Sequence, residues 1–132
     1  MSDTYTLRIE KSIDDLFRHL AQRASADEIK RMRSAYELAA EAHREQKRKS
    51  GEPFIMHPIA VATIVAEELE LDDNPIISAF LHDVVEDTDY TVEDMAERLG
   101  ISYRSVYRYI ETFKESGFVV QRKEGGIYIL GK

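Results

Sequence analysis

A histidine, an adjacent His-Asp pair and two further carboxylates stand close enough along the chain to share one metal site. A largely apolar segment separates His57 from His82 and Asp83. Glu86 follows His82, and Asp87 follows Asp83, at the four-residue spacing that places side chains on one helical face. Imidazole with carboxylate suits Mn²⁺, Fe²⁺ or Zn²⁺ better than Ca²⁺, and a carboxylate beside such an ion can take a proton from water. The five residues therefore predict a divalent-metal site with acid–base groups.

A basic loop just before the first of these histidines supplies groups that could bind a phosphate. Arg48 and Lys49 precede Ser50, and the neighbouring Gly51 and Pro53 favour a loop. An arginine in this place can contact a phosphate through two parallel hydrogen bonds. A metal site that faces an anion site indicates a metal-dependent phosphoester hydrolase, or the remnant of one.

Each of these features also has an ordinary structural explanation. A single histidine on an apolar helix face is commonly a core residue, an acidic helix end is commonly solvated, and a basic loop is commonly plain surface. Residue spacing alone leaves the choice between a functional site and these ordinary roles open.

The two helices that would carry the metal ligands have clear start signals. Pro58 suits the first turn of a helix, and Asn74 with Pro75 gives an N-cap followed by proline at the first helical position. The second helix, over residues 75–87, is apolar almost all round, which predicts a central place in the core. The side chains expected to be buried from both sides are Ile76, Phe80 and Val84.

Two more helices are expected before the basic loop. Residues 1–11 alternate weakly and are expected to form a frayed arm, after which Ser12 caps a helix. Ser25 and Glu28 form a capping box that begins a long helix, which we expect to end near Arg48. The predicted buried stripe of that helix comprises Ile29, Met32, Tyr36, Ala39, Ala40 and His43.

Composition narrows the class of protein. The chain has 132 residues, of which 43% are apolar and 33% are charged, and this suits one ordinary domain or two very small ones. The absence of cysteine excludes a disulfide scaffold and thiolate chemistry, and it agrees with a cytoplasmic location. No window approaches the ~18 apolar residues of a membrane helix, so no membrane is expected as a partner. The composition leaves a homodimer open.

A second pattern begins after residue 89. Residues 90–110 read YTVEDMAERLGISYRSVYRYI, with Gly100 between two helical segments. Strand-like residues then flank a Glu-Gly-Gly hairpin signal at 124–126. Residues 101–132 carry six lysines and arginines against three acidic residues, although the whole chain has a net charge of −7. The C-terminal part therefore differs from the rest in charge as well as in pattern.

This C-terminal part resembles the winged helix-turn-helix of bacterial regulators of the deoxyribose-repressor type. The resemblance implies that the second helix contacts DNA phosphates and base edges, with an affinity that depends strongly on salt. The residues at or near the exposed start of that helix are Tyr103, Arg104, Ser105, Tyr107 and Arg108. The alternative is a small helix-plus-hairpin appendage used for packing or dimerisation.

The stretch that contains the metal-site residues resembles a hydrolase family. Residues 48–58 read RKSGEPFIMHP and residues 80–88 read FLHDVVEDT, and both closely resemble the N-terminal HD hydrolase domain of the Rel/Spo family. The resemblance covers roughly residues 28–100. It implies hydrolysis of guanosine tetra- and pentaphosphate at the 3′-pyrophosphate, with Mn²⁺ or another divalent transition metal. The implied roles are metal binding for His57, His82 and Asp83, water activation and pyrophosphate positioning for Glu86 and Asp87, and nucleotide contact for Arg48, Lys49 and Ser50.

One departure from that family bears on activity. The family has a further Asp ligand well downstream of the His-Asp pair, whereas no Asp follows Asp94 here. We therefore expect weak or absent turnover, with water completing a three-residue ligand set. The alternative function is a DNA-binding or alarmone-sensing regulator that keeps the site without catalysis.

Together these patterns predict a mainly α protein. An HD-domain-like helical bundle is expected over residues 1–89, as a truncated metal-dependent phosphohydrolase domain. A winged helix-turn-helix with a short β-hairpin is expected over residues 90–132. The helix of residues 75–87 would belong to both and would carry an apolar face for each.

Overall fold

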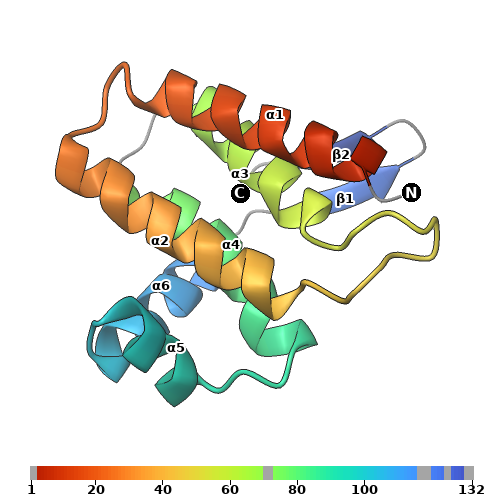
Figure 1. Ribbon diagram of the computed structural model, residues 1–132. Coiled ribbons are helices and arrows are strands. Elements are labelled where there is room, and N and C mark those ends of the chain that lie inside the picture. Colours follow the sequence, from red (N-terminus) through yellow and green to blue (C-terminus); the bar gives the residue numbers. More distant parts are fainter. Residues whose placement is uncertain (1–2, 70–72, 116–119, 124–125, 130–132) are drawn as a thin grey trace.

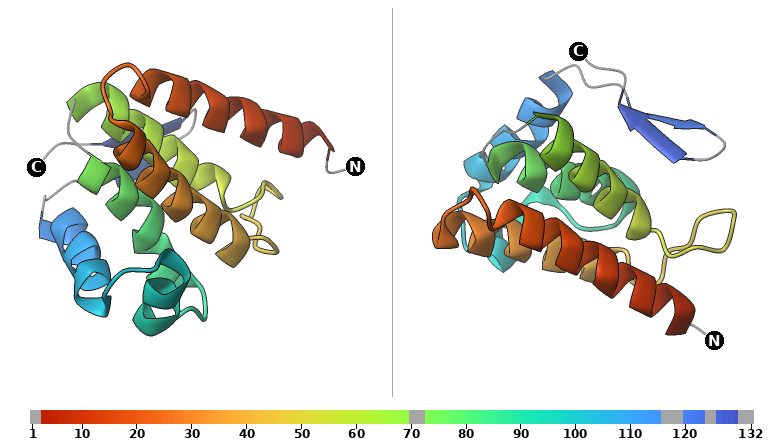
Figure 2. Two further views of the ribbon diagram at one scale, coloured as in Figure 1. Left: turned by 60° about the vertical axis from the view of Figure 1, so that its left-hand side comes forward. Right: turned by 90° about the horizontal axis from the view of Figure 1, so that it is seen from above.

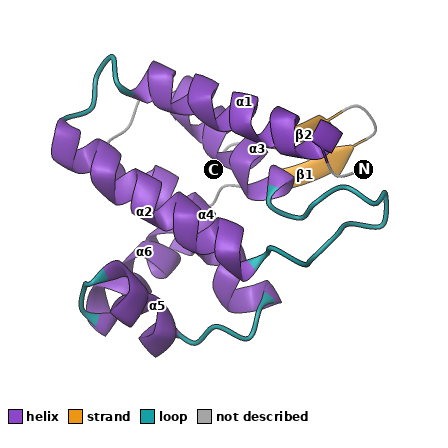
Figure 3. Ribbon diagram, viewed as in Figure 1, coloured by secondary structure: helices purple, strands orange, loops and turns teal. Residues whose placement is uncertain are grey.

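Six helices and one two-stranded sheet make up the described part of the chain, which comprises residues 3–69, 73–115, 120–123 and 126–129. The structure is a computed structural model (Figure 1). Its helices are α1 (Asp3–Leu20), α2 (Ala26–Ala42), α3 (Met56–Leu69), α4 (Asp73–Asp87), α5 (Val92–Leu99) and α6 (Tyr103–Glu115). Its strands are β1 (Val120–Lys123) and β2 (Gly126–Ile129), which pair antiparallel. Helices dominate the molecule, and an extended loop joins α2 to α3 (Figure 3).

Helix α1 begins much earlier than expected, because residues 3–11 are helical rather than a frayed arm. Ile9 packs against the core, and Ile13, one turn later on the same face, is buried. Leu7 lies off that face and is 65% exposed. The helical period therefore overrides the weak alternation, and Ser12 lies inside the helix instead of capping it.

Helix α2 begins at the predicted capping box, in which Ser25 and Glu28 exchange side-chain-to-backbone hydrogen bonds. It ends at Ala42, several residues before the predicted end near Arg48. The cause lies in the loop backbone: the Phe54 N–H donates to the Gln46 carbonyl at 2.9 Å, and the Arg48 N–H donates to the Glu52 carbonyl at 2.8 Å. Residues 46–48 therefore pair with residues 52–54 and cannot continue a helix.

Helix α4 is central, as its apolar sequence predicts. Ile76, Phe80 and Val84 are all buried. The helix packs against α2, α3 and α6 (Figure 2). The Phe80 ring meets Tyr36 of α2 edge-on at 5.7 Å between centroids. One continuous set of buried side chains extends from α1 through α6. Helices α5 and α6 therefore share the core formed by α1 to α4.

Helices α5 and α6 begin at local capping signals, and α5 ends at the glycine that the sequence places between the two helical segments. Thr91 and Asp94 form a capping box at the start of α5, with both hydrogen bonds at 3.0 Å. Gly100 ends α5 with a φ of 68°, which is the left-handed conformation that glycine tolerates best. The Ser102 hydroxyl accepts a hydrogen bond from the Ser105 N–H at 3.1 Å and caps α6.

The two C-terminal strands lie away from the α5–α6 turn. Val120 of β1 stands opposite Ile129 of β2, and Lys123 stands opposite Gly126. Strand β2 lies beside α3 (Figure 1). Among the described residues, no helix combines the length and hydropathy that crossing a lipid bilayer would require.

Candidate metal centre

Helices α3 and α4 bring four of the predicted site residues together. His57 lies in the first turn of α3, His82 and Asp83 lie near the end of α4, and the two helices pack against each other. His57 Nε2 is 3.8 Å from Asp83 Oδ2. His82, Asp83 and Glu86 each offer one ligand atom, and these atoms all lie within 4.8 Å of one another. Side chains from two helices therefore converge around Asp83.

The electrostatics of Asp83 indicate a place for a cation. Burial raises the pKa of the Asp83 carboxyl to about 6, Asp87 and Glu86 raise this pKa further, and His82 lowers it. The carboxylates of Asp87 and Glu86 disfavour the charged form of Asp83, and a divalent ion beside Asp83 would remove that repulsion. The donor set of imidazoles and carboxylates therefore fits a divalent transition metal.

His57 is in the protonation state that metal binding needs. Burial lowers its pKa, and His43 lowers it further, although Asp87 opposes the shift. The imidazole is therefore neutral near pH 7, with a lone pair available to a metal. Within the described residues the buried Nδ1 of His57 has no hydrogen-bond partner. The ring is thus held by packing, with Nε2 directed to Asp83.

His43 belongs beside this site, although the sequence indicated only that it is buried. Its side chain is 1% exposed, and its ring centroid lies 4.5 Å from that of Phe54. The Phe54 ring in turn lies 6.0 Å from the His57 ring. Burial lowers the pKa of His43, and the Asp87 carboxylate opposes that shift. A polar ring on an apolar stripe was the only signal in the sequence, and it could not identify these neighbours.

Arg48 reaches toward the same aromatic ring. Its guanidinium carbon lies 5.5 Å from the centroid of Phe54. Because Phe54 also contacts His57, the arginine lies one ring away from a predicted metal ligand. The contact with Phe54 therefore connects the Arg48 guanidinium of the basic loop to the metal-site residues.

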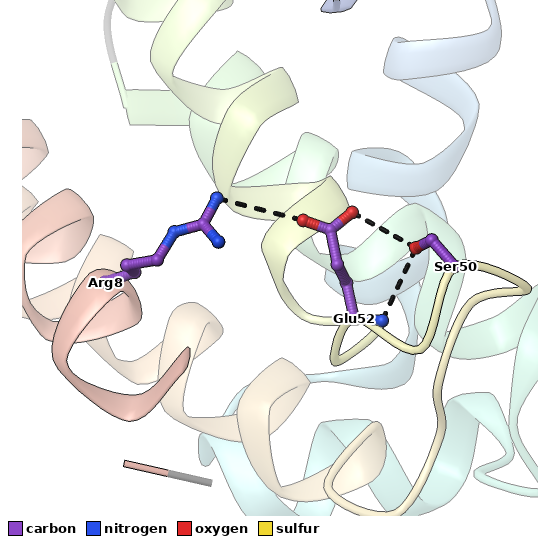
Figure 4. A network of polar contacts seen from close by, with 3 residues as sticks. All are labelled: Arg8, Ser50 and Glu52. Carbon is purple, nitrogen blue, oxygen red and sulfur yellow. Dashed lines mark hydrogen bonds and ion pairs between the residues drawn. The ribbon is translucent and has the colours of Figure 1, made fainter. Parts of the chain in front are cut away.

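Lys49 and Ser50 lie further out on the loop and are exposed. The Ser50 hydroxyl donates to Glu52 Oε1 at 3.2 Å and accepts from the Glu52 N–H at 3.4 Å (Figure 4). Glu52 also forms an ion pair with Arg8 of α1 at 3.8 Å. This network orders the loop and links it to α1. In this conformation the Ser50 hydroxyl is hydrogen-bonded to the Glu52 carboxylate.

The residues predicted to contact DNA lie together on α6. Tyr103 and Tyr107 are 49% and 46% exposed, and their rings meet edge-on at 5.2 Å between centroids. Arg104 and Arg108 are exposed, and Ser105 is half-buried. Helix α6 therefore presents two tyrosines and two arginines on its outer surface.

The family comparison covers most of this architecture. The model of the HD domain family matches residues 35–117, a range that includes α3, α4, α5 and α6. The match thus contains the proposed metal residues and also the helix pair that precedes the C-terminal strands.

Three curated proteins illustrate the similarity to individual relatives. A guanosine-3′,5′-bis(diphosphate) 3′-pyrophosphohydrolase of Aquifex aeolicus is 42% identical over 124 residues, which are 94% of this chain and 16% of that protein. The bifunctional (p)ppGpp synthase/hydrolase SpoT of Escherichia coli is 53% identical over 76 residues, 58% of this chain and 11% of that protein. A GTP pyrophosphokinase of Streptomyces coelicolor is 47% identical over 72 residues, 54% of this chain and 8% of that protein. The chain spans about a sixth or less of the length of these relatives.

Proposed function

This chain belongs to the HD domain family, and from that premise we propose that it is a divalent-metal phosphohydrolase. The observation that carries the proposal is the convergence of His57, His82, Asp83 and Glu86 from two helices. When bound, a divalent ion such as Mn²⁺ would supply Lewis acidity and lower the pKa of a water molecule.

The side chains divide into proposed ligands and proposed acid–base groups. His57, His82 and Asp83 would hold the ion, since they are the less exposed members of the group. The Glu86 side chain is 51% exposed, and its Oε2 lies 3.1 Å from His82 Nε2. A carboxylate in that position can take a proton from the attacking water and release it to solvent. Asp87 is proposed to orient the water and the pyrophosphate group.

The proposed substrate is guanosine 3′,5′-bis(diphosphate). The names of the relatives from Aquifex aeolicus and Escherichia coli support it, because one specifies hydrolysis of this compound and the other specifies hydrolysis of (p)ppGpp. Water would attack phosphorus in the 3′-diphosphate, the bond from that phosphorus to the ribose oxygen would break, and GDP and pyrophosphate would leave. Arg48, Lys49 and Ser50 are proposed to contact the nucleotide, with Arg48 the best placed through its contact with Phe54.

The direct test is an assay of the purified chain with guanosine tetraphosphate and Mn²⁺, followed by chromatography of the nucleotide products. We expect GDP and pyrophosphate to form only with the metal present, and to stop forming when EDTA removes it. Hydrolysis that EDTA leaves unchanged would contradict the proposal.

A binding experiment separates the two functional classes. If calorimetry shows that Mn²⁺ and guanosine tetraphosphate both bind but no product forms, the alarmone-sensing alternative replaces catalysis. If neither ligand binds, the convergence of the four side chains has no metal function. A cytoplasmic location and a homodimer also remain predictions; light scattering of the purified chain tests the second.

A second candidate function is DNA binding through α6. The observation that favours it is the exposed cluster of Tyr103, Arg104, Tyr107 and Arg108, which combines stacking and phosphate-binding groups on one helix. In this proposal residues 90–132 act as a winged helix-turn-helix that shares α4 with residues 1–89. The net charge of −7 opposes DNA approach and predicts modest affinity.

Fluorescence anisotropy with duplex DNA tests this second candidate. Arg104→Ala is expected to weaken binding about tenfold, which lies within the usual 1–3 kcal/mol for an arginine contact. It should also reduce the slope of log affinity against log salt by about one. Arg18→Ala, an exposed arginine on α1, is the matched control and should change neither quantity. Equal effects of the two substitutions would exclude α6 as the contact surface.

A further inference from the structure

One polar side chain connects the start of the basic loop to the end of α4. The Gln46 side chain contacts the His43 Nδ1 through Oε1 at 2.8 Å. Its Nε2 donates to the backbone carbonyl of Asp87, 41 residues away, at 2.5 Å. The three residues come from the end of α2, the loop that follows it and the last position of α4. We call this arrangement the Gln46 clasp.

The proton positions within the clasp follow from its chemistry. A backbone carbonyl can only accept, so the amide nitrogen of Gln46 must face Asp87. The amide oxygen must then face His43, and because it can only accept, His43 Nδ1 must carry the hydrogen. His43 is buried against the Phe54 ring, which fixes the plane of its imidazole. The Asp87 carbonyl and the Nδ1–H of His43 therefore require the same orientation of the Gln46 amide.

The carbonyl that Gln46 caps is one that the helix cannot satisfy itself, because the last carbonyls of an α-helix lack intrahelical donors. The turn before it is closed by Thr88, whose N–H and hydroxyl donate to the Val84 carbonyl at 3.2 and 2.6 Å. Glu86 and Asp87 stand on this last turn, one turn after His82 and Asp83. Any movement of the final turn therefore moves Glu86 and Asp87 before it moves the two ligands.

We propose that Gln46, oriented by His43, is a positioning residue that holds the last turn of α4 and thereby aims Glu86 and Asp87 at the metal-bound substrate. The inference rests on the proposed function for its catalytic consequence, but the clasp itself acts in the unliganded protein. The clasp separates the two halves of the site: His57, His82 and Asp83 would hold the ion, and the clasp would place the acid–base groups beside it.

Substitutions at Gln46 and His43 separate the effects of the two hydrogen bonds in the clasp. They also separate the hydrogen-bond donor of His43 from the rest of its ring. Gln46→Leu removes both hydrogen bonds, and Gln46→Glu keeps an acceptor for His43 but loses the donor to Asp87. His43→Leu removes the hydrogen that orients the amide, whereas His43→Asn retains a donor near the position of Nδ1. Gln22→Leu, an exposed glutamine in the α1–α2 connection, is the matched control.

The first readout is amide hydrogen exchange of the metal-free protein over residues 84–88. Gln46→Leu and Gln46→Glu are expected to speed exchange at Thr88 roughly tenfold, because the turn that Gln46 caps opens more often. His43→Leu should behave like them, and His43→Asn and Gln22→Leu should match the wild type. Unchanged exchange at Thr88 in both Gln46 variants would overturn the proposal, whether or not the protein hydrolyses any nucleotide.

The second readout joins kinetics with calorimetry. Gln46→Leu should lower kcat about tenfold or more, the usual size for a supporting hydrogen bond around a metal site. KM and Mn²⁺ affinity should stay within about twofold, since the clasp does not touch the ligands. A variant with faster exchange but an unchanged kcat would show that the clasp is only structural. If the wild-type protein does not hydrolyse the nucleotide, the proposed hydrolase function is contradicted. The hydrogen-exchange rates would then still test whether Gln46 holds the last turn of α4.

Discussion

Replacing His82 with alanine is expected to abolish Mn²⁺ binding and, with it, the metal-dependent hydrolysis. The substitution removes one imidazole from the group formed by His82, Asp83 and Glu86 and leaves its two carboxylates facing each other. A metal ion contributes several kcal/mol to such a reaction, and each 1.4 kcal/mol is about tenfold, so the loss in kcat/KM should approach a thousandfold. Titration calorimetry measures the binding, and the nucleotide assay measures the rate.

His19→Ala is the control for this experiment, because it makes the same change at a partly buried histidine on α1. It should retain Mn²⁺ binding and whatever turnover the wild type has. If His82→Ala binds Mn²⁺ as tightly as His19→Ala, the ion is held elsewhere and the proposed ligand set is wrong. If His82→Ala loses Mn²⁺ binding and the wild type shows no turnover, the metal site is supported. The alarmone-sensing alternative is then favoured over catalysis.

Phe80→Ala is expected to cost about 3–5 kcal/mol of the free energy of unfolding, as truncation of a fully buried phenylalanine usually does. Phe80 is completely buried at the centre of α4 and meets Tyr36 of α2 edge-on. For a chain of this size the loss corresponds to a fall in Tm of roughly 10–20 °C. Thermal unfolding followed by circular dichroism measures it.

The matched control is Leu7→Ala, which truncates an aliphatic side chain that is 65% exposed on α1. Its effect should stay within about 0.5 kcal/mol. The shape of the transition carries further information. Because α4 contacts both α2 and α6, one cooperative transition is expected in every variant. Two separate transitions would show that residues 90–132 fold independently and that α4 does not serve both parts.

The features of this protein that depend on residues a few positions apart could be predicted from the sequence. The capping box at Ser25 and the glycine stop at Gly100 each depend on a single turn of backbone, so their positions were predictable. The same is true of His82 and Glu86, which share a helix face by their spacing alone. The almost uniformly apolar sequence of residues 75–87 likewise predicted that Phe80 would be buried.

Errors arose where a local pattern competed with a tertiary contact. Residues 3–11 were expected as an arm, yet packing of Ile9 and Ile13 on one face against the core makes them helical. Helix α2 was expected to reach Arg48, but pairing between Gln46 and Phe54 across the loop ends it early. In the first case the deciding contact joins α1 to segments distant in the sequence, and in the second it joins the two sides of one loop, from residue 46 to residue 54.

The sequence by itself determined the inventory of the site: two imidazoles, their carboxylate neighbours, and helices able to carry them. Only the tertiary structure decided that His57 of α3 lies 3.8 Å from Asp83 of α4, and that Gln46 reaches the carbonyl of Asp87. The physical reason is that helix formation depends on neighbours within one or two turns, whereas the distance between two helices depends on how all their buried faces pack together.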